Sequence, residues 1–317
     1  MTKYLKSWQS GELQKKADKA LRMLADCAIC PRKCRVNRLN EKTGFCKTGS
    51  KARIHSFLAH NGEEPPISGE YGSGTIFFSG CNMACVYCQN FEFSQNKSGK
   101  ELTPEEISGL MLKLQKLKCH NINLVTPTHV MPQILQALSI ACENGLNIPL
   151  IYNTSGYEDD NILRLLDGIV DVYLADMRYA DAKISKKYSC APDYPLLNKK
   201  AVLEMHKQVG IAKFNRSDMI ISGLIIRHLI LPQYSAGTDE IMRFISREIS
   251  PETYISLMSQ YTPYYKACDF NEINRRASLE EYDNAVRIMN KYGLHNGWTQ
   301  DSGGLESFAG IHIKPNI

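Results

Sequence analysis

The segment Gly74–Asn90, GTIFFSGCNMACVYCQN, places three cysteines directly after a short apolar stretch. Cys81, Cys85 and Cys88 are separated by three and then by two residues. The β-branched and aromatic residues before them predict a buried strand over Thr75–Ser79. Thiolates that lie so close in a loop can converge on one soft metal centre. The sequence therefore predicts a metal-binding loop at the end of a strand.

Five further apolar stretches predict strands, and helical patterns lie between them. The predicted strands are Ile122–Thr126, Ile148–Asn153, Ile169–Asp176, Ile220–Leu231 and Thr253–Met258. Capping boxes that begin at Thr103 and at Ser278 predict the starts of two of the helices. For the first of these helices, the expected apolar face is Leu110, Leu114 and Leu117. Alternating strands and helices predict an α/β fold with a parallel sheet, in which ligands bind at the carboxyl ends of the strands.

The chain divides by pattern into two predicted parts, residues 1–72 and 73–317. Residues 1–26 have apolar side chains at helical spacing and predict an amphipathic lead-in helix. The stretch from Cys27 to Gly72 has little periodicity, which predicts an irregular, metal-organised module and a connector. The second part is predicted to hold the strand and helix repeat and a C-terminal extension.

A second group of cysteines lies near the N-terminus. Cys27, Cys30, Cys34 and Cys46 are separated by two, three and eleven residues. Four thiolates can close a tetrahedral zinc site or ligate an iron-sulfur cluster, and the spacing leaves both open. The other four cysteines stand alone and are expected to be small buried apolar residues. They are Cys119, Cys142, Cys190 and Cys268.

Composition limits the class of protein. The chain has 317 residues, 43% of them hydrophobic, and a formal net charge of +5. The positive residues are scattered, so a nucleic-acid partner is not indicated. No signal peptide or membrane-spanning run is evident, which favours a cytoplasmic protein without a membrane partner. In a reducing cytosol, clustered thiols are expected to hold metal and not to form disulfides.

The cysteine loop and several other motifs together resemble a known enzyme family. These motifs are C-x2-C-P-x2-C, GEEPPISG, GSGTIFFSGCN, TPTH, YNTSGY and IIRHLILP. They are similar to radical SAM enzymes, and within them to the pyruvate formate-lyase activating enzyme-like (PflX-like) branch. The resemblance implies a partial (β/α)6 barrel with a small N-terminal cysteine-rich metal-binding module.

The resemblance also implies a reaction. Cys81, Cys85 and Cys88 would hold a [4Fe-4S] cluster whose fourth iron is open to S-adenosylmethionine. Reductive cleavage of S-adenosylmethionine would give a 5′-deoxyadenosyl radical that abstracts hydrogen from a substrate. If the branch applies literally, the substrate is a glycyl-radical enzyme such as a pyruvate formate-lyase; another protein, peptide or small molecule is equally open. An electron donor such as flavodoxin or ferredoxin is implied.

The other strand ends supply candidates for binding S-adenosylmethionine. Tyr87 is expected near the adenine or the cluster. The Gly-Gly-Glu motif of many relatives is replaced here by INLVTPTH, so Thr126, Thr128 and His129 are candidates to take its place. Three short polar residues after the third strand would face a ribose or a carboxylate; they are Asn153, Thr154 and Ser155.

Each charged residue near the strand ends has two possible roles. Asp176 either orients substrate or pairs with Arg178 or Arg227. Arg227 interrupts an apolar strand and must meet an anion, either the carboxylate of S-adenosylmethionine or an internal Asp. Glu63 and Glu64 either bind substrate or form a solvated turn.

Two rival classes use the same cysteines without catalysis. One is a cysteine-rich, zinc-stabilised interaction or nucleic-acid-binding protein, which predicts a basic surface with aromatic stacking platforms that the sequence does not show clearly. The other is a passive electron carrier, which would need a fourth ligand for the Cys81 loop.

Overall fold

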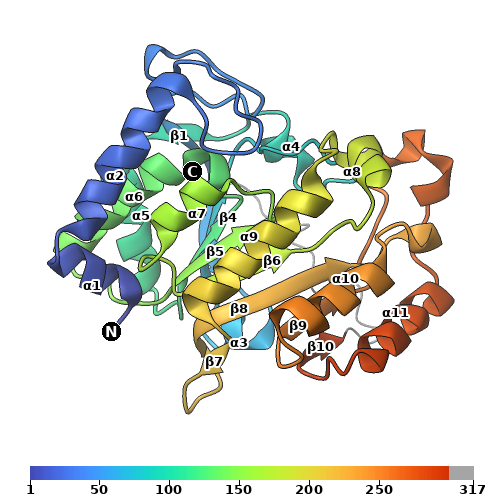
Figure 1. Ribbon diagram of the computed structural model, residues 1–317. Coiled ribbons are helices and arrows are strands. Elements are labelled where there is room, and N and C mark those ends of the chain that lie inside the picture. The colour runs from blue at the N-terminus through green and yellow to red at the C-terminus, as the bar shows by residue number, and fades with distance from the viewer. Residues whose placement is uncertain (300–317) are drawn as a thin grey trace.

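The computed structural model describes residues 1–299, in which one ten-stranded sheet is flanked by helices (Figure 1). All six predicted strands are present and pair in parallel in the order β9-β8-β6-β5-β4-β2. Their bounds are β2 Ser73–Phe78, β4 Ile122–Val125, β5 Leu150–Thr154, β6 Val172–Asp176, β8 Ile220–Leu229 and β9 Tyr254–Met258. The predicted partial (β/α)6 barrel is confirmed. The end of the predicted C-terminal extension, residues 300–317, lies outside the described residues.

Helices cover the outer face of this sheet, and the main ones lie between consecutive strands. They are α5 Pro104–Lys116, α6 Met131–Glu143, α7 Asp160–Leu166, α8 Ala182–Ser189, α9 Tyr194–Val209, α10 Thr238–Phe244 and α11 Leu279–Lys291. Both predicted capping boxes are formed, by Thr103 with Glu106 and by Ser278 with Glu281. The predicted apolar face of α5 is partly wrong. Leu117 is 53% exposed, because the buried stripe is rotated toward Ile107 and Met111.

Side chains of the parallel strands alternate between two environments. Tyr152 and Tyr173 point outward into the large core beneath the helices. Ile151, Val172 and Leu174 point inward and form an apolar floor with Ile225. Because successive residues of a strand face opposite sides, Asn153, Asp176 and Arg227 also point inward, one step nearer the carboxyl ends. The barrel interior is thus apolar at its floor and polar at its rim.

Additional strands extend the sheet at both edges. β1 Ala52–His60 pairs antiparallel with β2, and β3 Lys100–Leu102 pairs with β1. At the other edge, β10 Gly297–Thr299 is parallel to β9, while β7 Lys213–Phe214 pairs with β8. The expectation of an irregular connector up to Gly72 is therefore wrong for β1. The predicted division between residues 72 and 73 runs through the β1–β2 pairing.

The predicted N-terminal lead-in is helical but broken. α1 Lys3–Gln9 and α2 Glu12–Arg22 are separated by Gly11, whose φ of 76° ends the first helix. Leu13, Ala17 and Ala20 are fully buried where α2 packs along α6. In Figure 1 the two blue helices lie beside the green α6. The first helices are thus part of the barrel wall.

The cysteine-rich stretch after α2 is irregular, as predicted. Between Cys27 and Ser50 its one regular element is the 3-10 turn Arg38–Asn40. Single 3-10 turns also occur elsewhere, with a π-helical turn at Ile245–Ile249; the short α-helices α3 Pro65–Ser68 and α4 Phe91–Ser94 complete the fold. No helix within residues 1–299 is long and apolar enough to cross a membrane.

All eleven cysteines lie in the described residues, and none of them forms a disulfide there. Cys119 and Cys142 are buried, which confirms their packing role. The same expectation is wrong for Cys190 and Cys268, which are exposed. Cys190 ends α8 in a left-handed conformation, and Cys268 lies in a 3-10 turn, so both are at surface chain reversals.

We expect Leu13→Ala to lower the free energy of unfolding by about 2–5 kcal/mol, because it leaves a cavity between α2 and α6. Urea denaturation would measure the loss. Lys19→Ala, on the exposed side of α2, is the control and should change stability by less than about 0.5 kcal/mol. Equal losses in both variants would contradict this packing.

Candidate active site

A cavity of about 500 Å³ opens at the carboxyl ends of the parallel strands. Consecutive strands each contribute a lining side chain: Thr126 after β4, Asn153 and Thr154 of β5, Asp176 of β6, Arg227 of β8, and Ser256 and Met258 of β9. The loop after β2 covers one side with Tyr87 and Cys88. Parallel strands thus deliver most of the predicted site residues to one place.

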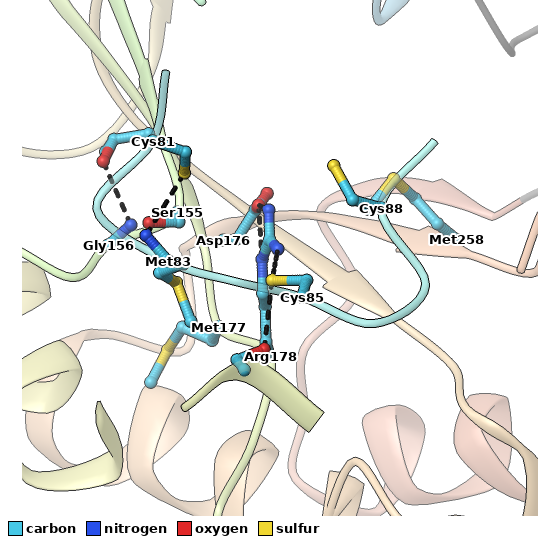
Figure 2. Close-up of polar contacts among 12 residues, drawn as sticks. Cys81, Met83, Cys85, Cys88, Ser155, Gly156, Asp176, Met177, Arg178 and Met258 are labelled. Carbon is cyan, nitrogen blue, oxygen red and sulfur yellow. Dashed lines mark hydrogen bonds and ion pairs between the residues drawn. The ribbon is translucent and has the colours of Figure 1, made fainter. Parts of the chain in front are cut away.

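The three cysteines lie along one loop beside this cavity, and Cys88 lines it (Figure 2). Figure 2 shows Cys81, Cys85 and Cys88 along the loop, with Ser155, Asp176 and Arg178 next to them. Cys85 is buried, and Cys81 and Cys88 are half-buried. Each sulfur has a hydrogen-bonding neighbour. The backbone N–H of Met83 donates to Cys81 Sγ at 3.3 Å, and Ser94 Oγ lies 3.2 Å from Cys88 Sγ.

Cys85 has two donors, and one of them carries charge. Arg178 Nη1 donates to Cys85 Sγ at 3.0 Å, and Ser189 Oγ donates to it at 3.0 Å. The other edge of the Arg178 guanidinium binds Asp176, with Nε and Nη2 at 3.0 and 2.6 Å from Oδ2. Burial acts to lower the pKa of Arg178, but Asp176 and then Cys85 more than offset it and raise the pKa. A fixed positive charge therefore faces the cysteine loop.

These donors fit a cluster held by thiolates. Burial, followed by the neighbouring Cys85, raises the pKa of Cys81 to about 12, and burial also raises the pKa of Cys88. The metal-free thiols are therefore protonated, and iron must displace those protons to bind. Within residues 1–299, no three Cys, His, Asp or Glu side chains are arranged to hold a single ion. A cubane cluster places each thiolate on a separate iron, so its ligands stand farther apart than those of one ion.

Aromatic side chains pack against the Tyr87 side of the cysteine loop. The hydroxyls of Tyr87 and Tyr179 are hydrogen-bonded, and Tyr179 also bonds Ser189 Oγ at 2.7 Å. The Tyr87 ring packs edge-on against Tyr261 at 5.4 Å between centroids. Tyr87 lines the cavity together with Cys88.

Arg227 meets an anion, but the anions belong to the protein and are glutamates. Nε and Nη2 of Arg227 bond the two carboxylate oxygens of Glu64 at 2.7 and 2.5 Å, and Nη2 also bonds Glu63. Although burial acts to raise it, Arg227 holds the pKa of Glu64 below its usual value. The expected internal Asp and the expected solvated turn are both wrong, because the turn before α3 folds into the barrel. Arg227 was expected to bind the carboxylate of S-adenosylmethionine because it needs an anion. Glu63 and Glu64 already supply that anion.

The end of β5 and the residue after it line the cavity with polar side chains. Ser155 is 7% exposed and lines the cavity, yet its Oγ has no hydrogen-bond partner among the described residues. Gly156 follows with a φ of 72°, and a Cβ there would lie 2.7 Å from the carbonyl oxygen of Asp176. Thr126 also has a left-handed φ of 58°, at the turn that leads out of β4. Asn153, Thr154 and Ser155 therefore line the cavity together at the rim.

The structure does not bring His129 to this cavity. It lies in the 3-10 turn Thr128–Val130, fully buried, and its Nε2 is 2.8 Å from the carbonyl oxygen of Ser79. Burial lowers the pKa of His129 to about 4, so the ring is neutral. Thr128 is buried as well and donates to Glu158 at 2.6 Å. Of the TPTH residues considered, Thr126 lines the cavity.

Sequence reasoning missed three residues that shape the site. Arg178 was considered as a partner of Asp176 and not as a donor to Cys85. Ser189, at the end of α8, has no sequence signal because it is 104 residues from Cys85. Glu158 is fully buried behind the rim, where it accepts hydrogen bonds from Thr128, Thr154 and Tyr152. Its one signal was the YNTSGYE sequence that continues past β5.

The N-terminal cysteines also gather. Cys30 is close enough to Cys46, Cys27 and Cys34 for all three to raise its pKa, after burial. The backbone N–H of Phe45 donates to Cys34 Sγ at 3.3 Å. A Cβ on Gly44 would lie 2.7 Å from that sulfur, so a side chain at this position would crowd it. The other three cysteines are therefore near Cys30, and Cys46 lies beside Gly80 at the start of the three-cysteine loop. Within residues 1–299 these four side chains are not arranged to hold a single ion.

The fold and the site together define an α/β barrel with a three-cysteine loop beside its ligand cavity. Residues 75–221 match the radical SAM superfamily. An uncharacterised protein of Methanocaldococcus jannaschii is 32% identical over 292 residues, which cover 89% of this chain and 79% of that protein. The chain belongs to the radical SAM superfamily, whose members use a [4Fe-4S] cluster and S-adenosylmethionine.

Two further proteins are similar to this chain. The pyruvate formate-lyase-activating enzyme of Clostridium pasteurianum is 24% identical over 194 residues, which cover 59% of this chain and 74% of that enzyme. This similarity confirms the predicted relation to the pyruvate formate-lyase activating enzyme-like branch, as a distant one. A radical SAM methyltransferase from Sphaerobacter thermophilus has a TM-score of 0.48 and 14% identity, covering 73% of this chain and 67% of that one.

Glu158 should give the protein a pH-dependent stability. Burial raises its pKa to about 7 from 4.5, so the native state favours the protonated form. The resulting stability is full below pH 4.5 and is lost as pH rises to about 7. We expect wild type to lose about 3 kcal/mol relative to Glu158→Gln across this range, measured by urea denaturation. The exposed Glu143→Gln variant should follow wild type; a parallel course for Glu158→Gln would contradict this role.

Proposed function

We propose that Cys81, Cys85 and Cys88 hold the catalytic [4Fe-4S] cluster and that S-adenosylmethionine binds between this loop and the strand ends. The observation that carries the proposal is the three-cysteine loop beside a cavity lined by the ends of consecutive parallel strands. When bound, the reduced cluster and S-adenosylmethionine supply a 5′-deoxyadenosyl radical for hydrogen abstraction. The noncatalytic zinc protein is not favoured, because the chain belongs to a family of enzymes.

The chain's own residues would position the reactants. Arg178 and Ser189 donate to Cys85 and would stabilise thiolate charge on the cluster. Ser155 Oγ and Asn153 face the cavity with polar groups suited to a ribose or carboxylate, and Gly156 permits a close backbone approach. Tyr87 and Tyr261 would keep water from the cluster side of the cavity. His129 is assigned no contact with the cofactor.

The substrate would bind in the same cavity. Its lining includes Glu63, Glu64 and Arg227, two carboxylates against one guanidinium. We propose a protein, peptide or small-molecule substrate there, and the relation to the clostridial activating enzyme supports a glycyl-radical enzyme as one candidate. The proposal includes a flavodoxin or ferredoxin as electron donor and the reducing cytoplasm as the site of action. The four N-terminal cysteines are proposed to bind a second metal, either zinc or an iron-sulfur cluster.

The direct test is cleavage of S-adenosylmethionine. Anaerobic protein is reconstituted with iron and sulfide, reduced in the presence of S-adenosylmethionine, and assayed for 5′-deoxyadenosine by chromatography. We expect product from wild type and background levels from Cys85→Ala, because the variant lacks a cluster ligand. Cys119→Ala, which changes a buried cysteine outside the loop, should retain activity. If fully loaded wild type gave no more product than Cys85→Ala, the proposed function would be wrong.

Arg178 can be tested separately from turnover. We expect Arg178→Met to lose cluster iron to a chelator about 10–100-fold faster than wild type, since it removes the charged donor to Cys85. Arg164→Met is the matched control, because Arg164 forms an exposed ion pair with Asp160 away from the loop. Iron release at the wild-type rate from Arg178→Met would show that this contact does not stabilise the cluster.

A further inference from the structure

Arg38 is a buried cation without a protein counter-charge. Its side chain is 0% exposed. Its guanidinium bonds two uncharged acceptors, Nε to the carbonyl of Gly49 at 3.0 Å and Nη1 to that of His129 at 2.8 Å. Within residues 1–299 it forms no ion pair with a carboxylate, and Nη2 has no hydrogen-bond partner. Because an unpaired buried charge is strongly unfavourable, an anion is expected at this place.

The N-terminal cysteines lie next to Arg38 and carry negative charge when they bind a metal. Arg38 Nη1 is 3.9 Å from Cys27 Sγ. Cys30 is close to the other three cysteines, and the backbone N–H groups of Arg32 and Phe45 donate to the sulfurs of Cys30 and Cys34. Neutral thiols gain little from such donors, whereas thiolate ligands are strengthened by them. These N–H groups and the Arg38 guanidinium therefore lie where they could donate to metal-bound thiolates.

Metal binding would supply the missing anion. Four thiolates around an oxidised [4Fe-4S] core carry a net charge of about −2, and so do four thiolates around zinc. The cluster fits the present arrangement better, because the four cysteines are not placed to hold a single ion. We propose that Cys27, Cys30, Cys34 and Cys46 bind an anionic metal centre and that Arg38 is its buried counter-ion. This inference rests on the second metal of the proposed function and is independent of S-adenosylmethionine cleavage.

The same arginine connects this centre to the catalytic loop. Arg38 holds the carbonyl of His129, and the His129 ring bonds the carbonyl of Ser79, two residues before Cys81. Between them, a Cβ on Gly80 would lie 2.7 Å from the carbonyl oxygen of Cys46. The backbone of the fourth N-terminal cysteine is thus in contact with the residue that precedes the first catalytic cysteine. Arg38 is therefore a positioning residue, which contacts the N-terminal cysteines directly and the Cys81 loop through His129.

The test uses the full chain with Cys81, Cys85 and Cys88 changed to alanine, so that only the N-terminal group can bind metal. After anaerobic reconstitution with iron and sulfide, or with zinc alone, metal and sulfide per chain are measured. The thermal midpoint of stripped and loaded protein is then compared for this background and for the same background with Arg38→Met, Arg38→Lys or Arg35→Met. Arg35 is the matched control, since it is exposed and paired with Asp26.

We expect the background protein to bind metal and to unfold at a higher temperature when loaded. Arg38→Met should lose at least half of this metal-dependent shift and release metal to a chelator about 10–100-fold faster. Arg38→Lys, which keeps the charge, should retain most of the shift, and Arg35→Met should match the background. Bound iron with sulfide identifies a cluster, whereas zinc without sulfide identifies a single ion, and both support the anionic centre.

Three results would overturn the inference. One is a background protein that binds neither metal. Another is an Arg38→Met protein whose metal-dependent shift and release rate equal those of the background. The third applies even if Arg38→Met fails to fold: an Arg38→Lys protein that folds but loses the metal-dependent shift would show that the charge is not what the centre needs. Because the background lacks the catalytic cysteines, none of these results depends on whether the wild type cleaves S-adenosylmethionine.

Discussion

The parallel hydrogen bonding of β2, β4, β5, β6, β8 and β9 is the constraint on which the rest of the structure depends. Parallel neighbours require crossover connections, and the helices in these connections bury the outer face of the sheet. All six strands then run in one direction, so their carboxyl ends meet at one rim. The loops that begin at Gly80, Ser155 and Met177 leave the sheet there, and each brings polar groups to the same cavity.

Charge at this rim is organised in two different ways. Arg178 with Asp176, and Arg227 with Glu63 and Glu64, satisfy one another within the protein, and such pairs orient side chains more than they stabilise the fold. Within residues 1–299, Arg38 lacks a carboxylate partner of this kind. A buried pair is electrostatically satisfied by itself, whereas a buried single charge is not. The two arginines at the rim therefore shape the cavity, while Arg38 is left with uncharged acceptors.

Local pattern predicted the strands and the cysteine loop, but it could not predict distant contacts. The six strands are short apolar runs, and the spacing of Cys81, Cys85 and Cys88 lies within one loop. β1 was missed because Ala52–His60 mixes charged and polar residues with apolar ones along both faces. The pairing of Arg227 with Glu64 spans 163 residues, which no spacing rule reaches. His129 was placed at the cavity because it follows a strand, yet the 3-10 turn at Thr128 directs its ring inward.

Arg32 connects the two cysteine segments mechanically. Its Nε and Nη1 donate to the carbonyls of Asn82 and Cys190, and its guanidinium lies 3.9 Å from the centre of the Phe45 ring. One side chain from the N-terminal segment therefore holds the backbone directly after Cys81, the end of α8 and the residue before Cys46. A displacement of any of these segments would shift the other two, so the two cysteine segments are expected to become ordered together.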